Sequence, residues 1–479
     1  MHLNLDRIFR GPAVWLIAVA WMASHGWFIG ADPDLSMATG SRGAWTDEGT
    51  LLSQVRNFLN GHGLEMLSSD GLMKAPLFSL IGLVVFEAFG IGHFQARMMV
   101  LAIVSITILF LLTRKPFRLA VTILIVTTFT LLPIHQHSHL ALTETVSIAC
   151  ILIAAYRFYL QVCQPKWINL LWVHAWLVLA VLVKIQFVYL LPLPLICSLF
   201  LRDYKAVRHS LFFLFVSLVT GILVFWAFKD HWMAFQRAQS GSWTLDGSSL
   251  HHMLTNATNY FFRLRMLPFA LLGFCAMGFF FWDRQRFSRP LFSLFLFGGV
   301  WTLLECHKLT MDYLPVRYMV SFYVAFGLMT AAGLAHVFES QRLKSLRLAL
   351  IAIVLLVVAT NTLVMAMAYQ SRKNEMEQVR AYLKSTVRKT DVLAGTWGPS
   401  LTWDLHNKVF PVWEGFTRSS LLSEAEPPTV LITEHDFNES GGFFQKHFAM
   451  DSASPFDSVR TFKVLDWYVK VCWMPAKNQ

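Results

Sequence analysis

Charged residues are scarce in this chain. Of its 479 residues, 14% are Asp, Glu, Lys or Arg, whereas 55% are hydrophobic, and the mean hydropathy is +0.50. Soluble domains carry about 25% charged residues, so this composition excludes an ordinary soluble globular protein. Because long apolar runs recur from one end of the chain to the other, the fold class that remains is a polytopic α-helical membrane protein.

The chain also lacks cysteine motifs and the surface pattern of a nucleic-acid-binding protein. Its six cysteines lie mostly in or beside apolar runs, and none pair at C-x-x-C or zinc-finger spacing, which argues against a structural disulfide or a thiolate metal site. The formal net charge is +11, but Lys and Arg gather in short loops between apolar runs, without interleaved aromatic residues. That distribution is the positive-inside bias of a membrane protein.

About eleven segments are long enough to span a bilayer, since each holds about 17–20 apolar residues. They cover residues 12–30, 94–113, 117–134, 140–160, 169–183, 185–201, 209–228, 266–282, 290–306, 314–336 and 346–369. The first reads as a retained signal-anchor helix. If the spans alternate, the basic loops fall on one side, so we expect a multi-pass protein of the inner (plasma) membrane with a cytoplasmic N-terminus.

Two regions of the extracytoplasmic face stand out. In the first outer loop, residues 31–93, an amphipathic helix is expected to begin near Thr46 or Asp47 and to lie along the membrane surface. The apolar stretch Pro76–Phe89 is about fourteen residues long, which is short for a span and typical of an interfacial or re-entrant helix. Residues 1–369 would form the transmembrane domain, and the polar tail, 370–479, a small extracytoplasmic α/β domain with a helix and three strand-like segments.

Three carboxylates and one lysine are candidates for chemistry. Asp47 and Glu48 fall at the positive end of the predicted helix dipole, which favours an ionised carboxylate suited to act as a base; a capped surface helix is the alternative. Glu144 lies where an apolar span begins, so a functional role and a place in the headgroup zone both stay open. Lys74 is expected at the level of the lipid headgroups, where it snorkels or pairs with a lipid phosphate.

Further cations gather on the same face, which lacks a general cation bias. Lys184 stands between two apolar runs, and Arg317 lies near the outer end of the tenth span, beside Tyr313 and Lys308. Arginine binds phosphate through two parallel hydrogen bonds, and lysine binds it as a point charge. Together with Lys74, these residues predict a site for an anionic lipid.

The sequence HQHSH places three histidines, His135, His137 and His139, in a short outer loop. In a strand they would share one face and could ligate a metal ion. A short loop gives them no such common face, so we assign no metal ligand from the sequence.

The order of these features resembles the GT-C superfamily of polytopic glycosyltransferases, and within it the branch of protein O-mannosyltransferases and lipid A aminoarabinose transferases. The segments that carry the resemblance cover roughly residues 1–340 and are TDEGTLLSQVRNFLNGHGL, MKAPLFSLIGLVVFEAFGIGHFQARMM, LALTETVS, LAVLVKIQFVYLLPLPLI and LPVRYMVSFYVAFGL. The resemblance implies a catalytic base at Asp47, a second acid at Glu144 and a lipid-phosphate contact at Lys74. The chain departs from the family pattern at Thr50, Ala75 and Ile185.

The implied function is transfer of a sugar from a polyprenyl-phosphate donor to an acceptor hydroxyl of a lipid, glycan or protein at the outer face. Fixed cations suit the developing charge of the phosphate leaving group, and one base without a covalent nucleophile implies an inverting displacement. Glu144 would position the acceptor or a divalent cation; no other cofactor is expected. The alternatives are a transporter or flippase of lipid-linked sugars, disfavoured by the lack of internal repeats, and an O-antigen polymerase or ligase.

Overall fold

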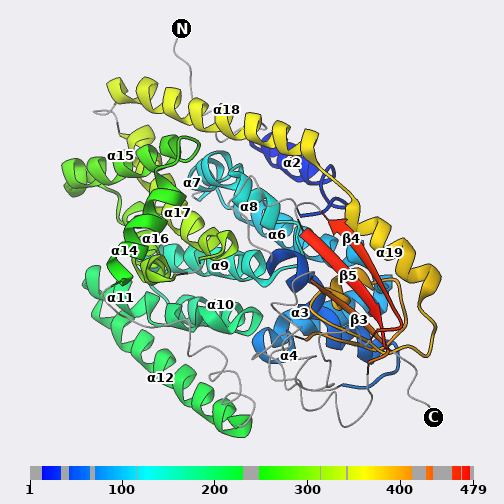
Figure 1. The fold of residues 1–479 in the computed structure, drawn as a ribbon. Helices are drawn as coiled ribbons and strands as arrows, with labels where there is room; N and C mark the ends of the chain where they lie inside the picture. Colours follow the sequence, from blue (N-terminus) through cyan, green and yellow to red (C-terminus); the bar gives the residue numbers. More distant parts are fainter. Residues whose placement is uncertain are drawn as a thin grey trace.

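The computed structural model describes residues 13–33, 43–64, 71–115, 117–229, 248–312, 314–340, 344–412, 428–434, 456–464 and 467–474. Helices dominate it (Figure 1). Eleven predicted spans each overlap an apolar helix or a pair of consecutive helices. These are α2 (Ala13–His25), α6 (His93–Thr113), α7 (Arg118–Leu124) with the π-helix η2 (Ile125–Phe129), α9 (Thr143–Cys163), α10 (Trp167–Val183), the 3-10 helix η3 (Ile185–Leu190) with α11 (Leu193–Phe200), α12 (Tyr204–Ala227), α15 (Leu267–Asp283), α16 (Arg289–Glu305), α17 (Val316–Glu339) and α18 (Arg347–Ser371).

Shorter helices connect these segments or lie outside them. They are α3 (Gly43–Leu59), α4 (Gly71–Lys74), α5 (Pro76–Phe89), α8 (Leu132–His137), α14 (Ser249–Phe261), α19 (Glu375–Thr386) and α20 (Gly398–Leu401), with the 3-10 helices η4 (Arg284–Arg286), η5 (Cys306–Thr310) and η6 (Lys344–Leu346). Helix α5 has the bounds that the sequence predicted for a short interfacial helix, and Pro76 occupies its first turn, where the missing N–H costs nothing.

Within the described residues, 6 helices are long and apolar enough to cross a membrane, namely α6, α9, α12, α16 extended by η5, α17, and α18 continuing into α19. The other predicted spans coincide with apolar helices of 10–17 residues. Two of the predicted spans contain a proline at which a new helix begins, because Pro133 lies in the first turn of α8 and Pro192 directly precedes α11. The chain is thus a multi-pass helical protein, and the count of about eleven spans stays a prediction.

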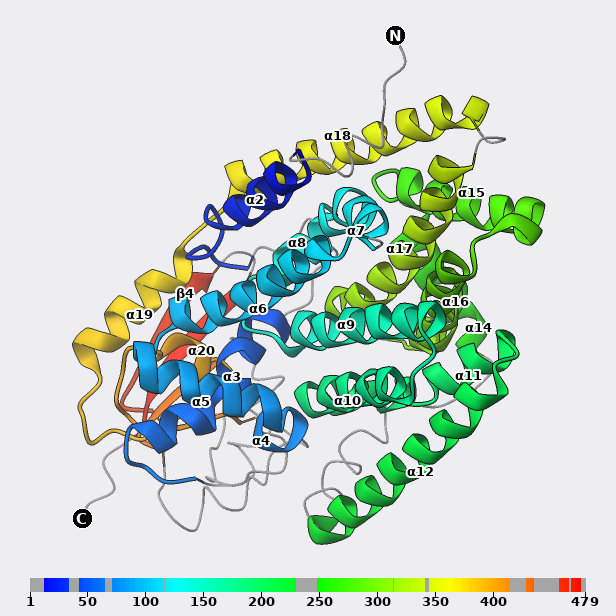
Figure 2. The ribbon, with the colours of Figure 1, turned by 180° about the vertical axis from the view of Figure 1, so that it is seen from behind.

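Helix α17 is the centre of the bundle. Its apolar window is 100% buried, whereas that of α12 is 6% buried. In both views α17 runs between α7 and α16, and α12 and α18 lie at opposite edges (Figures 1 and 2). Close packing depends on small residues, as a Cβ on Gly298 of α16 would come within 2.5 Å of the backbone nitrogen of Met329 in α17. The exposed apolar sides of α12 and α18 fit contact with lipid.

The C-terminal segment contains a five-stranded sheet with the strand order β2-β1-β3-β5-β4. The strands are β1 (Leu393–Ala394), β2 (Val409–Phe410), β3 (Val430–Glu434), β4 (Ser458–Val464) and β5 (Trp467–Trp473). Strand β1 is parallel to β2 and β3, and β5 is antiparallel to β3 and β4. The last strand-like segment of the sequence is therefore a hairpin, not one strand. Helix α19 contributes three buried side chains, Met376, Val379 and Leu383, to the core of this sheet. That residues 370–479 form a separate domain stays a prediction.

Helix α3 differs from its prediction in two ways. It begins at Gly43, about one turn before the predicted cap, so Asp47 and Glu48 lie within the helix rather than at its positive end. Its polar face is also buried: Gln54, Arg56 and Asn57 are each at most 2% exposed. The polar face of α3 therefore packs against the C-terminal segment and not against water, and the predicted position of α3 along the membrane surface stays a prediction.

Contacts of the polar face of α3 explain this burial. Arg56 donates hydrogen bonds to the backbone oxygens of Pro399 and Thr402, at 3.3 and 3.0 Å. The Asn57 amide donates to the oxygen of Val409 at 2.9 Å and accepts from the nitrogen of Val409 at 3.1 Å. Backbone groups of α20 and β2 thus take the place of water around α3.

Candidate active site

The two neighbouring acids of α3 point to different partners. Successive residues of an α-helix are separated by about 100° around its axis. Asp47 pairs with Arg317 at the start of α17, whereas Glu48 pairs with Arg97 in the first turns of α6. Each acid therefore belongs to a separate cluster.

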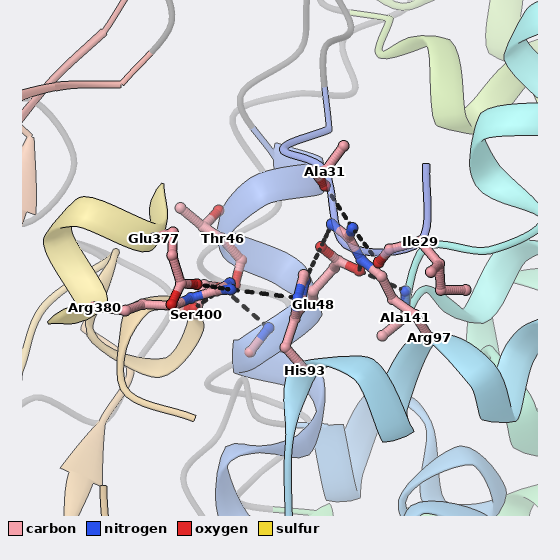
Figure 3. Close-up of polar contacts among 11 residues, drawn as sticks. Ile29, Ala31, Thr46, Glu48, His93, Arg97, Ala141, Glu377, Arg380 and Ser400 are labelled. Atoms are coloured by element: carbon pink, nitrogen blue, oxygen red, sulfur yellow. Dashed lines mark hydrogen bonds and ion pairs between the residues drawn. The ribbon is translucent and has the colours of Figure 1, made fainter. Parts of the chain in front are cut away.

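Glu48 and Arg97 form a buried, bidentate ion pair (Figure 3). Arg97 Nε and Nη2 donate to the two carboxylate oxygens at 2.9 and 2.8 Å. The backbone N–H of Ala141 donates to the same carboxylate at 2.7 Å, and His93 Nε2 lies 3.4 Å from it. Burial alone would raise the pKa of Glu48, but Arg97 and His93 hold that pKa well below its usual range. Glu48 is thus charged at neutral pH and connects α3, α6 and the loop before α9.

Arg97 extends this anchor to the end of the first helix. Its Nη1 donates to the backbone oxygens of Ile29 and Ala31, at 2.9 and 2.6 Å. With these bonds the guanidinium meets four acceptors and is 0% exposed. The sequence analysis contained Arg97 only within one of the family motifs and assigned it no role. The available signal was an arginine inside an otherwise apolar helix, which indicates a buried partner.

The second cluster is a chain of four charged side chains, Asp47, Arg317, Glu144 and Lys184, which we call the charged quartet. Arg317 Nη1 contacts Asp47 Oδ2, and Arg317 Nε lies 3.9 Å from Glu144 Oε1. Lys184 Nζ donates to Glu144 Oε1 at 2.6 Å. The quartet thus alternates acid and base, with Arg317 between the two carboxylates.

Helix ends bring the quartet together. Glu144 lies in the first turn of α9, Lys184 directly follows α10, and Arg317 lies in the first turn of α17. These ends meet on one side of the bundle, and α3 closes over them with Asp47. The side chains remain partly open: Asp47 is 22% exposed and Arg317 is 11% exposed.

Lys74 adds a further cation beside the quartet. Burial raises the pKa of Asp47 above its ordinary value, and this rise is opposed by the positive charges of Arg317, Lys74 and Lys184. Three cations therefore act on a site that holds two carboxylates. The surplus positive charge suits an anionic ligand such as a phosphate.

The structure also shows a buried network that the sequence missed. Glu305, at the end of α16, pairs with Lys308 and accepts hydrogen bonds from Tyr189, Trp301 and Ser321, at 2.7, 2.9 and 2.8 Å. Lys308 Nζ also donates to Ser321 Oγ at 2.9 Å. Charged residues within an apolar span, as in LLECHKL, were the available signal. The network fixes the loop η5 to α17, one turn beyond Arg317.

Four of the predicted site residues, Asp47, Glu144, Lys184 and Arg317, therefore meet in one cluster, with Lys74 beside it. Glu48 pairs with Arg97 in the other cluster instead, and Tyr313 lies outside the described residues. In its place, the ring of Tyr318 lies 4.8 Å from Lys184 Nζ. Glu144 is bonded to Lys184, so its predicted role toward an acceptor or a divalent cation stays a prediction.

The fold is found in solved structures of known proteins. ArnT from Cupriavidus metallidurans bound to undecaprenyl phosphate matches with a TM-score of 0.59 at 14% identity, over 99% of this chain and 99% of that chain. The apo state of the same ArnT gives a TM-score of 0.59 at 15% identity, over 96% of this chain and 97% of that chain.

AglB, the oligosaccharyltransferase of Archaeoglobus fulgidus, was solved in complex with an inhibitory peptide and a dolichol-phosphate. It matches with a TM-score of 0.50 at 11% identity, over 89% of this chain and 70% of that chain. No protein-family model matches the sequence, and no curated protein matches it either. At these identities the likeness shows the fold, and it confirms the GT-C fold that the series of motifs predicted.

Proposed function

We propose that this protein transfers a glycosyl group from a polyprenyl-phosphate donor to an acceptor hydroxyl at the outer face of a membrane. The observation that carries the proposal is the shared position of Arg317, which contacts Asp47 and faces Glu144. Both similar structures with bound lipids hold a polyprenyl phosphate, undecaprenyl phosphate in ArnT and dolichol-phosphate in AglB. A phosphate and Asp47 would compete for the same guanidinium.

This competition supplies a mechanism. As the donor phosphate takes hydrogen bonds from Arg317, with Lys74 and Lys184 nearby, the carboxylate of Asp47 is released and becomes available as a base. Asp47 accepts the proton of the acceptor hydroxyl while that oxygen bonds to the anomeric carbon. The bond from the anomeric carbon to the phosphate oxygen breaks, and its electron pair stays on the phosphate. One displacement inverts the anomeric centre.

Positive charge is needed most where the leaving group develops. The phosphate gains negative charge as its bond to the sugar breaks, and fixed cations in a partly buried site stabilise that charge without reorganising. Removing one such group typically costs about 10²–10³ in rate. Arg317 and Lys184 are held by carboxylates before the donor binds, so their positions are set in advance.

An apolar cavity offers room for the lipid chain. It has a volume of about 540 Å³ between α15, α16 and α17, and its lining includes Phe261, Phe295, Leu309, Phe322, Phe326 and Met329. Leu309 and Phe322 directly follow Lys308 and Ser321 of the buried Glu305 network. The cavity therefore has an apolar lining beside the Glu305 network, which suits a polyprenyl chain.

Asp47→Asn tests the base. The amide keeps the size of the side chain but cannot accept the proton, so we expect transfer to fall by about 10²–10⁴-fold. Asp312→Asn is the matched control, because Asp312 carries an exposed carboxylate, with 89% of its side chain accessible. The assay is release of free polyprenyl phosphate from a radiolabelled polyprenyl-phosphate sugar in proteoliposomes with a membrane extract as acceptor.

Three results bear on the proposal. The proposal is supported if the wild type and Asp312→Asn release polyprenyl phosphate at the same rate and Asp47→Asn does not. Undiminished transfer in Asp47→Asn overturns the base assignment. Movement of intact sugar-lipid across the bilayer without release of polyprenyl phosphate would make the protein a transporter and refute the transferase proposal.

A further inference from the structure

Three buried histidines meet outside the active site. His25, at the end of α2, and His135 and His139, in and just after α8, each offer a ring nitrogen, and these atoms lie within 4.8 Å of one another. Their exposed fractions are 0%, 1% and 3%. Within the described residues, this is the one group of three or more His, Cys, Asp or Glu side chains that close together.

Helical geometry explains how the HQHSH sequence makes this group. Residues four apart lie on one face of a helix. Because α8 runs through His137 and the chain turns directly after it, His135 and His139 face α2 together. His137 falls on another side, where its Nδ1 lies 2.6 Å from the backbone oxygen of Pro133. Two histidines of the motif, His135 and His139, thus belong to the cluster, and His137 does not.

The hydrogen bonds of His135 fix which of its nitrogens is a lone-pair donor. Ser24 Oγ donates to the backbone oxygen of Trp21 at 2.6 Å. The same Oγ lies 2.7 Å from His135 Nε2, so with its own proton on Trp21 it accepts a hydrogen bond from the N–H at that nitrogen. His135 Nδ1 is then the unprotonated nitrogen. A second hydrogen bond that fixes the tautomer in this way is the usual support of a histidine that ligates a metal.

His25 carries an unexplained polar atom. Its Nδ1 lies 3.0 Å from Nδ1 of His139, while its Nε2 is buried and has no hydrogen-bond partner among the residues that the structure describes. The Nδ1 and Nε2 positions of an imidazole point in different directions, so the His25 atom that would bind a shared ion is Nδ1, which already lies beside the His139 ring nitrogen. Burial also lowers the pKa of His135 to about 3 and that of His139 well below its ordinary value, which keeps these imidazoles in the neutral form that binds metals.

We propose that His25, His135 and His139 bind one divalent transition-metal ion, for which zinc is the best match. Three imidazoles suit zinc, whose fourth tetrahedral position a water molecule would take. Tetrahedral ligation at about 2.05 Å separates ligand nitrogens by about 3.4 Å, so the 3.0 Å pair of His25 and His139 already has nearly the required spacing.

One adjustment is needed. The rings of His25 and His135 are stacked, with centroids 3.8 Å apart and planes 5° from parallel. Parallel rings cannot both direct an in-plane lone pair at one ion, so one ring must rotate about χ2. That torsion is broad and inexpensive for histidine.

The site would stabilise the loop of residues 138–142, which leads into the active site. The chain runs from His139 to Ala141, whose N–H donates a hydrogen bond to Glu48, and then to Glu144 of the charged quartet. An ion shared by α2 and α8 would hold this loop in place together with Glu48. The ion would thus have a structural role, and its binding does not depend on the proposed transferase activity.

The test uses the full chain, purified in detergent, stripped with a chelator and titrated with Zn²⁺ alone. We expect about one zinc per chain by elemental analysis in the wild type and in His137→Ala, the matched control from the same motif. His135→Ala and His139→Ala should bind at least tenfold more weakly. Ser24→Ala should weaken binding by about 10–100-fold, because it removes only the supporting hydrogen bond.

A spectroscopic measurement covers the case in which an alanine variant does not fold. Co²⁺ added to the stripped wild-type protein should give the visible absorption of a four-coordinate ion, and added zinc should abolish it. Zinc uptake in the titration, or a Co²⁺ absorption that zinc abolishes, supports the site. The proposal is overturned if the wild type takes up no zinc and shows no such absorption, or if His135→Ala retains wild-type zinc while eluting as a folded monomer.

Discussion

Gly49 is the position at which one methyl group should separate α3 from the C-terminal segment. A Cβ added there would lie 2.3 Å from the carbonyl carbon of Pro399 and 2.3 Å from the nitrogen of Ser400. Both are backbone atoms, which cannot swing aside as a flexible side chain does. Ordinary contact begins at 3.4 Å, so Gly49→Ala must push α3 and α20 apart by about 1 Å.

The magnitude follows from what that shift breaks. Gly49 N donates to Ser400 Oγ at 3.1 Å, and Ser400 Oγ donates to Thr46 O at 3.0 Å. Overpacking of this kind costs about 1–3 kcal/mol, and two lost hydrogen bonds add about 1 kcal/mol each. The better helix propensity of alanine returns about 1 kcal/mol. We expect a net loss of about 2–4 kcal/mol of stability.

The same shift should reach the chemistry, because Asp47 lies two residues before Gly49. A displacement of about 1 Å at a reacting group can cost about 10²-fold in rate. The assay is the fraction of protein that remains monodisperse in detergent after heating, together with polyprenyl phosphate release at a permissive temperature. The control is Gly221→Ala in α12, where an added Cβ meets nothing within 4 Å.

The result that refutes this reasoning is a Gly49→Ala protein with the heat resistance and the transfer rate of the wild type. It would mean that α20 does not rest on α3 in the folded protein. Loss in Gly221→Ala as well would show that the assay reports any substitution, and not contact between α3 and α20.

Three further predictions concern the two ion-pair clusters. Arg97→Leu should destabilise the protein by about 3–5 kcal/mol at pH 7, measured by thermal unfolding, because it leaves the Glu48 carboxylate buried without its cation. The folded-state pKa of Glu48 is lowered, so the ion pair contributes its full stability above the unfolded-state pKa of about 4.3, and this contribution is lost as the pH falls through the folded-state pKa. The difference in free energy of unfolding between the wild type and Arg97→Leu should therefore become smaller in acid. Arg317→Gln should move the acid limb of kcat/KM to higher pH, since it removes the strongest opposition to the burial that already raises the pKa of Asp47.

Each of these has an outcome that contradicts it. An Arg97→Leu protein as stable as the wild type would show that the pair is replaceable, and a gap that widens in acid would reverse the sign assigned to Glu48. An acid limb that stays in place or moves down in Arg317→Gln would show that Asp47 is not the titrating base.

The sequence predicted the class of the protein well because that signal is additive. Each apolar run reports burial or lipid contact on its own, so the helices overlap the predicted spans and α5 has its predicted bounds. The ordered motifs likewise predicted the fold that ArnT shares. Intramembrane charge also pointed to Glu144, Lys184 and Arg317, since a charge in an apolar segment needs a partner wherever it lies.

Partners were decided only by the tertiary structure. Nothing in the order DE distinguishes Asp47 from Glu48; their 100° separation on α3 and the arrival of Arg317 and Arg97 from distant helices assign them to different clusters. The polar face of α3 looked solvated because its partners, backbone groups of α20 and β2, lie more than three hundred residues away.

The histidines show the same division most sharply. The sequence determined that three imidazoles would stand near the start of the fourth span, but the backbone of that loop decided which could meet. A strand would have gathered His135, His137 and His139; the short helix α8 instead selects two of them and adds His25 from the first helix. Local sequence fixes which chemical groups are available, while long-range packing, which depends on every contact at once, decides which of them share a site.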